Sequence, residues 1–123
     1  NNIMGFADNH DMSRVYTELG QDVAKTKMAM TLFLTTRGIA QMYYGTEVLL
    51  DNTPSKDHGD IRIDFPGGFE GQTRNAFTKE GLKKQQKEMH NTISTLLNFR
   101  KNSSALLIIS GQSFYVIAPR VDW

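Results

Sequence analysis

The sequence predicts an α/β fold in which parallel strands alternate with helices. Residues 3–7 form an apolar run typical of a short strand buried on both faces, as parallel strands usually are. Residues 21–36 favour a helix, and the apolar run 39–44 predicts a second buried strand, which Gly45 closes. Two strands joined through a helix by short links form a βαβ unit, whose strands pair in parallel.

The first predicted helix has suitable residues at both of its ends. Asp22 places a negative charge in the first turn and Arg37 places a positive charge at the end, and both signs suit the helix dipole. Gly38 follows and is well placed to end the helix. Because the second half of the segment is apolar nearly all round, we expect other elements to cover it.

The chain between residues 47 and 80 is long and irregular. It contains many Gly and Asp residues and two prolines, and a stretch of this length is usually either a functional loop or disordered. Ile61 and Ile63 alternate with polar residues there, which permits a short strand.

A second helix is predicted over residues 83–101. Its apolar residues recur at helical spacing along one stripe, at Met89, Ile93, Leu96 and Leu97, with Arg100 extending the stripe. His90 falls on the polar side and is expected at the surface. Two β-type runs, 106–110 and 113–118, are joined by Gly111 and Gln112, which indicates a hairpin.

The composition excludes several classes of protein. The chain has 123 residues and a net charge of +1, with 39% hydrophobic residues, which argues against disorder. It has no basic block, so nothing indicates nucleic-acid binding. It has no cysteine, which excludes disulfides and thiolate metal sites. No apolar run is long enough to predict a membrane span, and no signal-peptide pattern is visible.

Two features predict that the chain is a piece of a larger domain. It starts within a strand-like segment, and it stops at Trp123 just after a turn signal. Two parallel strands and two helices cannot cover both faces and both edges of a sheet. We therefore expect this chain, taken alone, to associate with itself.

The polar cluster Asp8-Asn9-His10-Asp11 directly follows the first predicted strand. Ligand sites of α/β folds gather where strands end in loops. A carboxylate and an imidazole at such a place can bind a metal, orient hydroxyl groups or transfer protons. Asp and Asn also favour turns and helix caps, so the four residues alone leave these alternatives open.

Longer motifs around this cluster resemble the α-amylase family of glycoside hydrolases. Residues 6–11 (Phe-Ala-Asp-Asn-His-Asp), with Arg14 after them, are similar to the family's fourth signature region. Residues 38–47 resemble its later Gly-Ile-Pro-x-Ile-Tyr-Tyr-Gly-x-Glu signature, with Ala40 in the place of proline. Residues 97–106 resemble the family's Leu-Arg-Lys segment, and residues 60–69 are similar to its neopullulanase and cyclomaltodextrinase branch.

The resemblance implies a particular place in a (β/α)₈ TIM barrel. Residues 1–104 would be the C-terminal part of the catalytic barrel, with strands seven and eight and their helices. Residues 105–123 would begin a small antiparallel β C-terminal domain. A whole barrel takes about 250 residues, so this chain would be roughly half of one.

The resemblance also implies roles for the site residues. Asp11 matches the catalytic carboxylate that stabilises the transition state through the sugar hydroxyls, and His10 matches a neighbouring sugar contact. The nucleophile and the acid/base would lie before Asn1, on earlier strands. Arg62 matches an arginine that contacts sugar outside the cleavage point.

The remaining candidates are supporting residues. Asp8 and Asn9 are expected to hold the loop, and Glu47 to buttress the site. Arg14 is either a partner of nearby carboxylates or part of a surface salt bridge. Tyr44 can stack on sugar, although neighbouring strand residues face opposite sides, so at least one of Tyr43 and Tyr44 is expected in the core.

By resemblance, the expected function is that of a retaining enzyme cleaving α-glucosidic bonds in maltodextrin, cyclodextrin or pullulan-type α-glucans. A non-catalytic, carbohydrate-binding or transporter-associated relative with the same barrel is the main alternative, and an unrelated metal-dependent barrel enzyme is a third. No cofactor or metal is expected within this chain, whereas calcium is a candidate ligand of a longer parent. Related enzymes suggest a periplasmic or secreted location.

Overall fold

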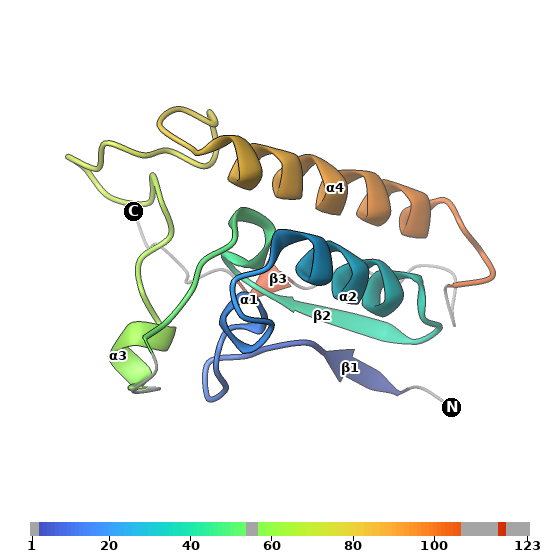
Figure 1. The fold of residues 1–123 in the computed structure, drawn as a ribbon. Coiled ribbons are helices and arrows are strands. Elements are labelled where there is room, and N and C mark those ends of the chain that lie inside the picture. Colours follow the sequence, from blue (N-terminus) through green and yellow to red (C-terminus); the bar gives the residue numbers. More distant parts are fainter. Residues whose placement is uncertain (1–2, 54–56, 107–115, 118–123) are drawn as a thin grey trace.

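A computed structural model describes residues 3–53, 57–106 and 116–117 of the chain. The strands β1 (Met4–Phe6) and β2 (Ile39–Tyr43) pair in parallel, with Met4 opposite Ile39. The helix α2 (Val23–Thr35) connects them, which confirms the predicted βαβ unit. Figure 1 shows α2 lying along the sheet, with α4 (Lys84–Lys101) packed beyond it.

The ends of α2 follow from local sequence. The carboxylate of Asp22 caps the helix by accepting hydrogen bonds from the backbone amides of Ala24 and Lys25, at 2.9 and 3.0 Å. Beyond the helix, Gly38 has a φ of +132°, and a Cβ built there would lie 2.7 Å from the carbonyl oxygen of Ile3. Only glycine lets the backbone approach the start of β1 so closely.

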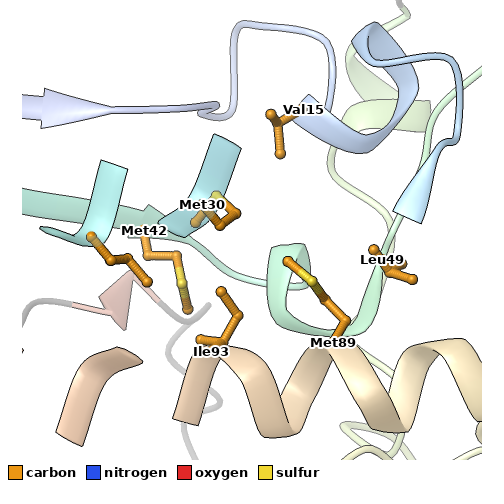
Figure 2. Packing of buried hydrophobic residues seen from close by; sticks show 7 residues of the cluster. Val15, Met30, Met42, Leu49, Met89 and Ile93 are labelled. Carbon is orange, nitrogen blue, oxygen red and sulfur yellow. The ribbon is translucent and has the colours of Figure 1, made fainter. Parts of the chain in front are cut away.

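The main core lies between α2, β2 and α4. Its seven buried side chains are Val15, Met30, Leu34, Met42, Leu49, Met89 and Ile93. Figure 2 shows this cluster and labels all of them except Leu34. The predicted stripe of α4 therefore does face the core. Arg100 closes its far end, because its buried guanidinium donates to the carbonyls of Leu34, Thr36 and Gly38 and so ties α4 to the end of α2.

Two expectations about burial are wrong. Met4 and Phe6 of β1 are 55% and 44% exposed, so this strand is not buried on both faces. Met28 and Leu32 of α2 are 73% and 71% exposed, so this helix is not covered all round. The physical reason is the same for both, because none of the described elements packs against these surfaces.

Short helices shape the loops. These are α1 (Val15–Glu18), the 3₁₀ helix η1 (Thr46–Val48) and α3 (His58–Ile61). The short strand expected around Ile61 is not formed, because Asp57 accepts a hydrogen bond from the amide of Gly59 and caps a helical turn instead. None of the described helices has the length and apolar character needed to cross a membrane.

The C-terminal hairpin lies largely outside the described residues. Of its two runs, the structure describes Leu106 and the strand β3 (Val116–Ile117), which pairs in parallel with β2. The sheet order is therefore β1-β2-β3. A separate domain over 105–123 remains a prediction.

Candidate active site

The predicted site residues gather where β1 and β2 run out into loops. Because the two strands are parallel, their carboxyl ends lie at the same edge of the sheet. In Figure 1, α3 lies on this side of the molecule, beyond the loops that follow the two strands. The edge thus receives three segments: residues 8–14 after β1, residues 44–48 after β2, and the α3 region.

Asp11 is an exposed acid of this edge and has three cationic or potentially cationic neighbours, His10, Arg62 and His58. One carboxylate oxygen, Oδ2, lies 3.1 Å from Nε2 of His10, and the other, Oδ1, lies 3.0 Å from Nη2 of Arg62. The side chains of Asp11, His10 and Arg62 are 58%, 60% and 46% exposed. A carboxylate, an imidazole and a guanidinium therefore face solvent together, where hydroxyl groups of a ligand can reach them.

The turn that presents Asp11 is held by its neighbours. Asn9 accepts a hydrogen bond through Oδ1 from the backbone amide of Asp11, at 2.8 Å, which is an Asx turn. Asp8 is buried and accepts from the amide of Val15 at 3.1 Å and from the hydroxyl of Thr46 at 2.9 Å. Asp8 thereby connects the loop after β1 to the loop after β2.

Burial raises the pKa of Asp8 above its usual value, and several contacts oppose this shift. The hydrogen bonds from Val15 and Thr46 and the positive charge of Arg14 all favour the carboxylate. Asp8 is buried, and its hydrogen bonds hold the two loops together.

Arg14 is fully buried, so the expectation of a surface salt bridge is wrong. Its guanidinium donates to the carbonyl of Tyr44 through Nη1 and to the carbonyl of Ile61 through Nε, the latter at 3.0 Å. It also lies 4.2 and 4.8 Å from the ring centres of Tyr43 and Tyr44, within range of cation–π attraction. Arg14 thus joins the ends of both strands to α3.

Both tyrosines lie in a second core cluster, which also contains Val48, Leu50, Ile61, Ala76 and Leu82. Their rings meet edge to face with centres 4.6 Å apart, and the hydroxyl of Tyr44 donates to the carbonyl of Ile63 at 2.8 Å. The expected separation onto opposite faces does not occur, because β2 ends at Tyr43 and the alternation ends with it. Tyr44 therefore anchors the segment that carries Arg62.

Glu47 lies apart from Asp11, on a cavity of about 360 Å³ between η1, β2 and α4. His90 lines the same cavity and is half-buried, so its expected surface position is wrong. Among the described residues, Oε2 of Glu47 and Nδ1 of His90 have no hydrogen-bond partner. Burial raises the pKa of Glu47 and, together with the charge of Lys79, lowers the pKa of His90.

The contacts of two residues were not predicted from the sequence. His58, in the loop, was only a weak candidate for lining a sugar subsite, and its Nδ1 lies 2.6 Å from Nη2 of Arg62 and 3.7 Å from Oδ1 of Asp11. Thr46 pairs with Asp8. The spacing of four residues between His58 and Arg62 was a usable signal, because such residues lie on one side of a helical turn.

Metal coordination finds no support in the described part of the chain. No three His, Asp or Glu side chains there form a group that can hold a metal ion. Calcium in a longer parent remains a prediction.

Comparison with known proteins finds a family whose model matches most of the chain. Residues 2–95 match the family described as "Alpha amylase, catalytic domain". The chain is 45% identical to a cyclomaltodextrin glucanotransferase of Paenibacillus macerans over 47 residues, which are 38% of this chain and 6% of the relative. It is 50% identical to that of Geobacillus stearothermophilus over 42 residues, 34% of this chain and 6% of the relative.

The chain is also similar to an amylase. The chain is 40% identical to the α-amylase SusG of Bacteroides thetaiotaomicron over 58 residues, which are 47% of this chain and 8% of the relative. The aligned segments therefore span only a small part of each of these relatives.

Proposed function

Because the chain belongs to the α-amylase catalytic-domain family, we propose that it forms part of the active site of an enzyme that cleaves α-glucosidic bonds in α-glucans. The observation that carries the proposal is the position of Asp11, which is exposed between His10 and Arg62 at the carboxyl end of the sheet. In barrel enzymes this end of the sheet holds the active site.

In this proposal β1 and β2 are the seventh and eighth strands of a (β/α)₈ barrel. The exposed apolar surfaces of β1 and α2 support this placement, because preceding strands and helices of a barrel would cover them. The aligned share of 6–8% of the similar enzymes fits a segment of a longer protein. We call the catalytic domain that contains this chain the complete domain.

Asp11 would act on the transition state. Retaining glycosidases use one carboxylate as nucleophile and another carboxyl group as acid and base, and the transition state resembles an oxocarbenium ion. Both of those groups would come from residues before Asn1. The carboxylate of Asp11 would accept hydrogen bonds from sugar hydroxyls and oppose the developing positive charge, contacts that strengthen as the transition state forms.

His10 and Arg62 would bind the same sugar region. Nε2 of His10 lies against Oδ2 of Asp11, so a sugar hydroxyl that reaches Asp11 also comes within reach of the imidazole. Arg62 supplies a guanidinium on the Oδ1 side. Asp11 has two oxygens with roughly four acceptor sites, so both contacts leave room for hydroxyl donors.

The finer substrate class is a neopullulanase or cyclomaltodextrinase type of activity on maltodextrin, cyclodextrin or pullulan. Residues 60–69 support this branch, whereas the similar cyclomaltodextrin glucanotransferases favour transfer to a sugar acceptor. Product analysis after incubation of the complete domain with maltodextrin separates the two, because hydrolysis yields linear reducing sugars and intramolecular transfer yields cyclic ones. A domain that binds maltodextrin without releasing any product would be the non-catalytic relative.

Asp11→Asn in the complete domain tests the assignment. Loss of one transition-state contact of this kind costs roughly 10²–10³ in kcat, while the exposed position predicts an unchanged melting temperature. Glu70→Gln, an exposed acid in the following loop, is the matched control and should retain full turnover. Near-normal turnover of the Asp11 variant on maltodextrin would contradict the proposal.

A further inference from the structure

His58 and Arg62 form one unit that reaches Asp11 from a distant part of the chain. His58 is the first residue of α3, and Arg62 follows the last. Nη2 of Arg62 lies 2.6 Å from Nδ1 of His58 and 3.0 Å from Oδ1 of Asp11, while its Nε donates to the carbonyl of His10 at 3.0 Å. Three acceptors therefore surround one guanidinium.

The chemistry of arginine determines which ring nitrogen of His58 carries the proton. A guanidinium has only donors, so Nδ1 of His58 must offer a lone pair to Nη2. The imidazole is then neutral and carries its proton on Nε2. The two hydrogens of Nη2 are directed one to His58 and one to Asp11.

We propose that His58 is a positioning residue, whose neutral imidazole holds the Arg62 guanidinium against Asp11 at the place where sugar is bound. This inference rests on the proposed function for its catalytic readout. Without His58, Arg62 is a long side chain that is about half exposed, with rotamer freedom that only its contacts to Asp11 and His10 restrain.

Protonation of His58 would break its hydrogen bond with Arg62 and favour a contact with Asp11. An imidazolium donates from both ring nitrogens, so it cannot accept from Arg62 and instead repels it as a like charge. Its Nδ1 lies 3.7 Å from Oδ1 of Asp11, close enough to take over that carboxylate. Neutral His58 thus leaves Asp11 to Arg62, and protonated His58 competes for it.

The other charged groups near this unit already have partners of their own. Asp57 caps α3 through the amide of Gly59, and Asp60 accepts a hydrogen bond from the hydroxyl of Thr53. His10 contacts the opposite oxygen of Asp11, at 3.1 Å. His58 itself contacts Arg62 on its own turn, at 2.6 Å, and Asp11 on the loop after β1, at 3.7 Å.

Substitutions at His58 in the complete domain test the proposal. His58→Ala removes the acceptor, and we expect KM for a maltooligosaccharide to rise about tenfold with a smaller change in kcat, since one hydrogen bond to a charged group is lost. In an Arg62→Ala background the same substitution should have no further effect. Equal effects in both backgrounds would overturn the proposal.

Rescue by a conservative variant separates positioning from a merely structural role. His58→Asn keeps an acceptor near the place of Nδ1, so it should restore KM where the alanine variant does not. His90→Asn is the matched control and should leave KM unchanged, because His90 lies on the separate cavity beside α4. An asparagine variant as impaired as the alanine variant would refute the proposal.

Nitrogen NMR of the imidazoles keeps this test independent of activity. The proposal predicts that Nδ1 of His58 is unprotonated at neutral pH and that its signal shifts in Arg62→Ala. A complete domain inactive on α-glucans with this signature would refute the proposed function alone. A proton on Nδ1 at neutral pH would refute the positioning role, whether or not the domain is active.

Discussion

Arg14→Met is expected to destabilise the complete domain by several kcal/mol. The guanidinium of Arg14 is fully buried and donates to the carbonyls of Tyr44 and Ile61. Methionine fills a similar volume but has no donor, so both carbonyls lose a charged partner. Each buried acceptor left unsatisfied costs about 1–3 kcal/mol, which amounts to roughly 2–6 kcal/mol for the two.

Two further contributions to this change in the free energy of unfolding have opposite signs. The contacts to the rings of Tyr43 and Tyr44 are lost, which adds up to about 2 kcal/mol when such a pair is desolvated. Removing a buried charge also relieves its desolvation cost, and Nη2 has no hydrogen-bond partner among the described residues. We therefore expect a net loss of about 4 kcal/mol, within the range for removing one partner of a buried charged contact.

Thermal and urea unfolding of the complete domain measure this loss. A change of about 4 kcal/mol lowers the melting temperature by roughly 10 °C in a domain of this size. Arg14→Lys should recover only part of it, because an ammonium lacks the planar fork that reaches both carbonyls. Lys87→Ala, on the exposed side of α4, is the control. An Arg14→Met variant within about 1 kcal/mol of the parent would refute the reasoning.

Three further predictions concern the site, the cavity and the chain taken alone. His10→Ala should lower kcat/KM roughly tenfold with an unchanged melting temperature, because the imidazole is exposed beside Asp11; an imidazole NMR signal that stays unchanged at saturating maltooligosaccharide would contradict it. Burial raises the pKa of Glu47, so the folded domain keeps this proton at pH values where the unfolded chain has released it, and stability falls as the pH rises through that window. Glu47→Gln should therefore be more stable than the parent at about pH 8 in thermal melts, with the advantage vanishing below about pH 4; an advantage that grows on acidification would be the wrong sign. The 123-residue chain alone should self-associate in sedimentation and release no reducing sugar from maltodextrin, because apolar side chains such as Leu32 are exposed and the nucleophile is expected elsewhere; a compact monomer or measurable hydrolysis would contradict one half each.

Elements that depend on neighbours in the sequence could be predicted. The stripe of α4 and the acidic start of α2 are set by residues three or four positions apart, and both are present with Met89 and Ile93 in the core and Asp22 as the cap. The cluster after β1 was also visible, because a polar run that ends an apolar strand is a local pattern.

Burial was predicted less well, because it depends on what packs against an element. Leu32 belongs to an apolar helix segment but is exposed, whereas the charged Arg14 and Arg100 are enclosed. Both guanidinium groups donate to backbone carbonyls at or next to the ends of helices and strands. These carbonyls belong to Tyr44 and Ile61 for Arg14 and to Leu34, Thr36 and Gly38 for Arg100. Hydropathy carries no information about such carbonyls.

The residues around Asp11 also differ in how far the sequence could predict their positions. Local patterns were enough to place Asp11 and His10 near the end of a strand, since both lie in the loop that follows β1. The contact with Arg62 joins residues 51 positions apart, and it forms because Arg14 and Tyr44 bind the carbonyls of Ile61 and Ile63 on either side of Arg62. No periodicity encodes a contact of that range, because the path of the intervening loop depends on hydrogen bonds that exist only after the strands have paired.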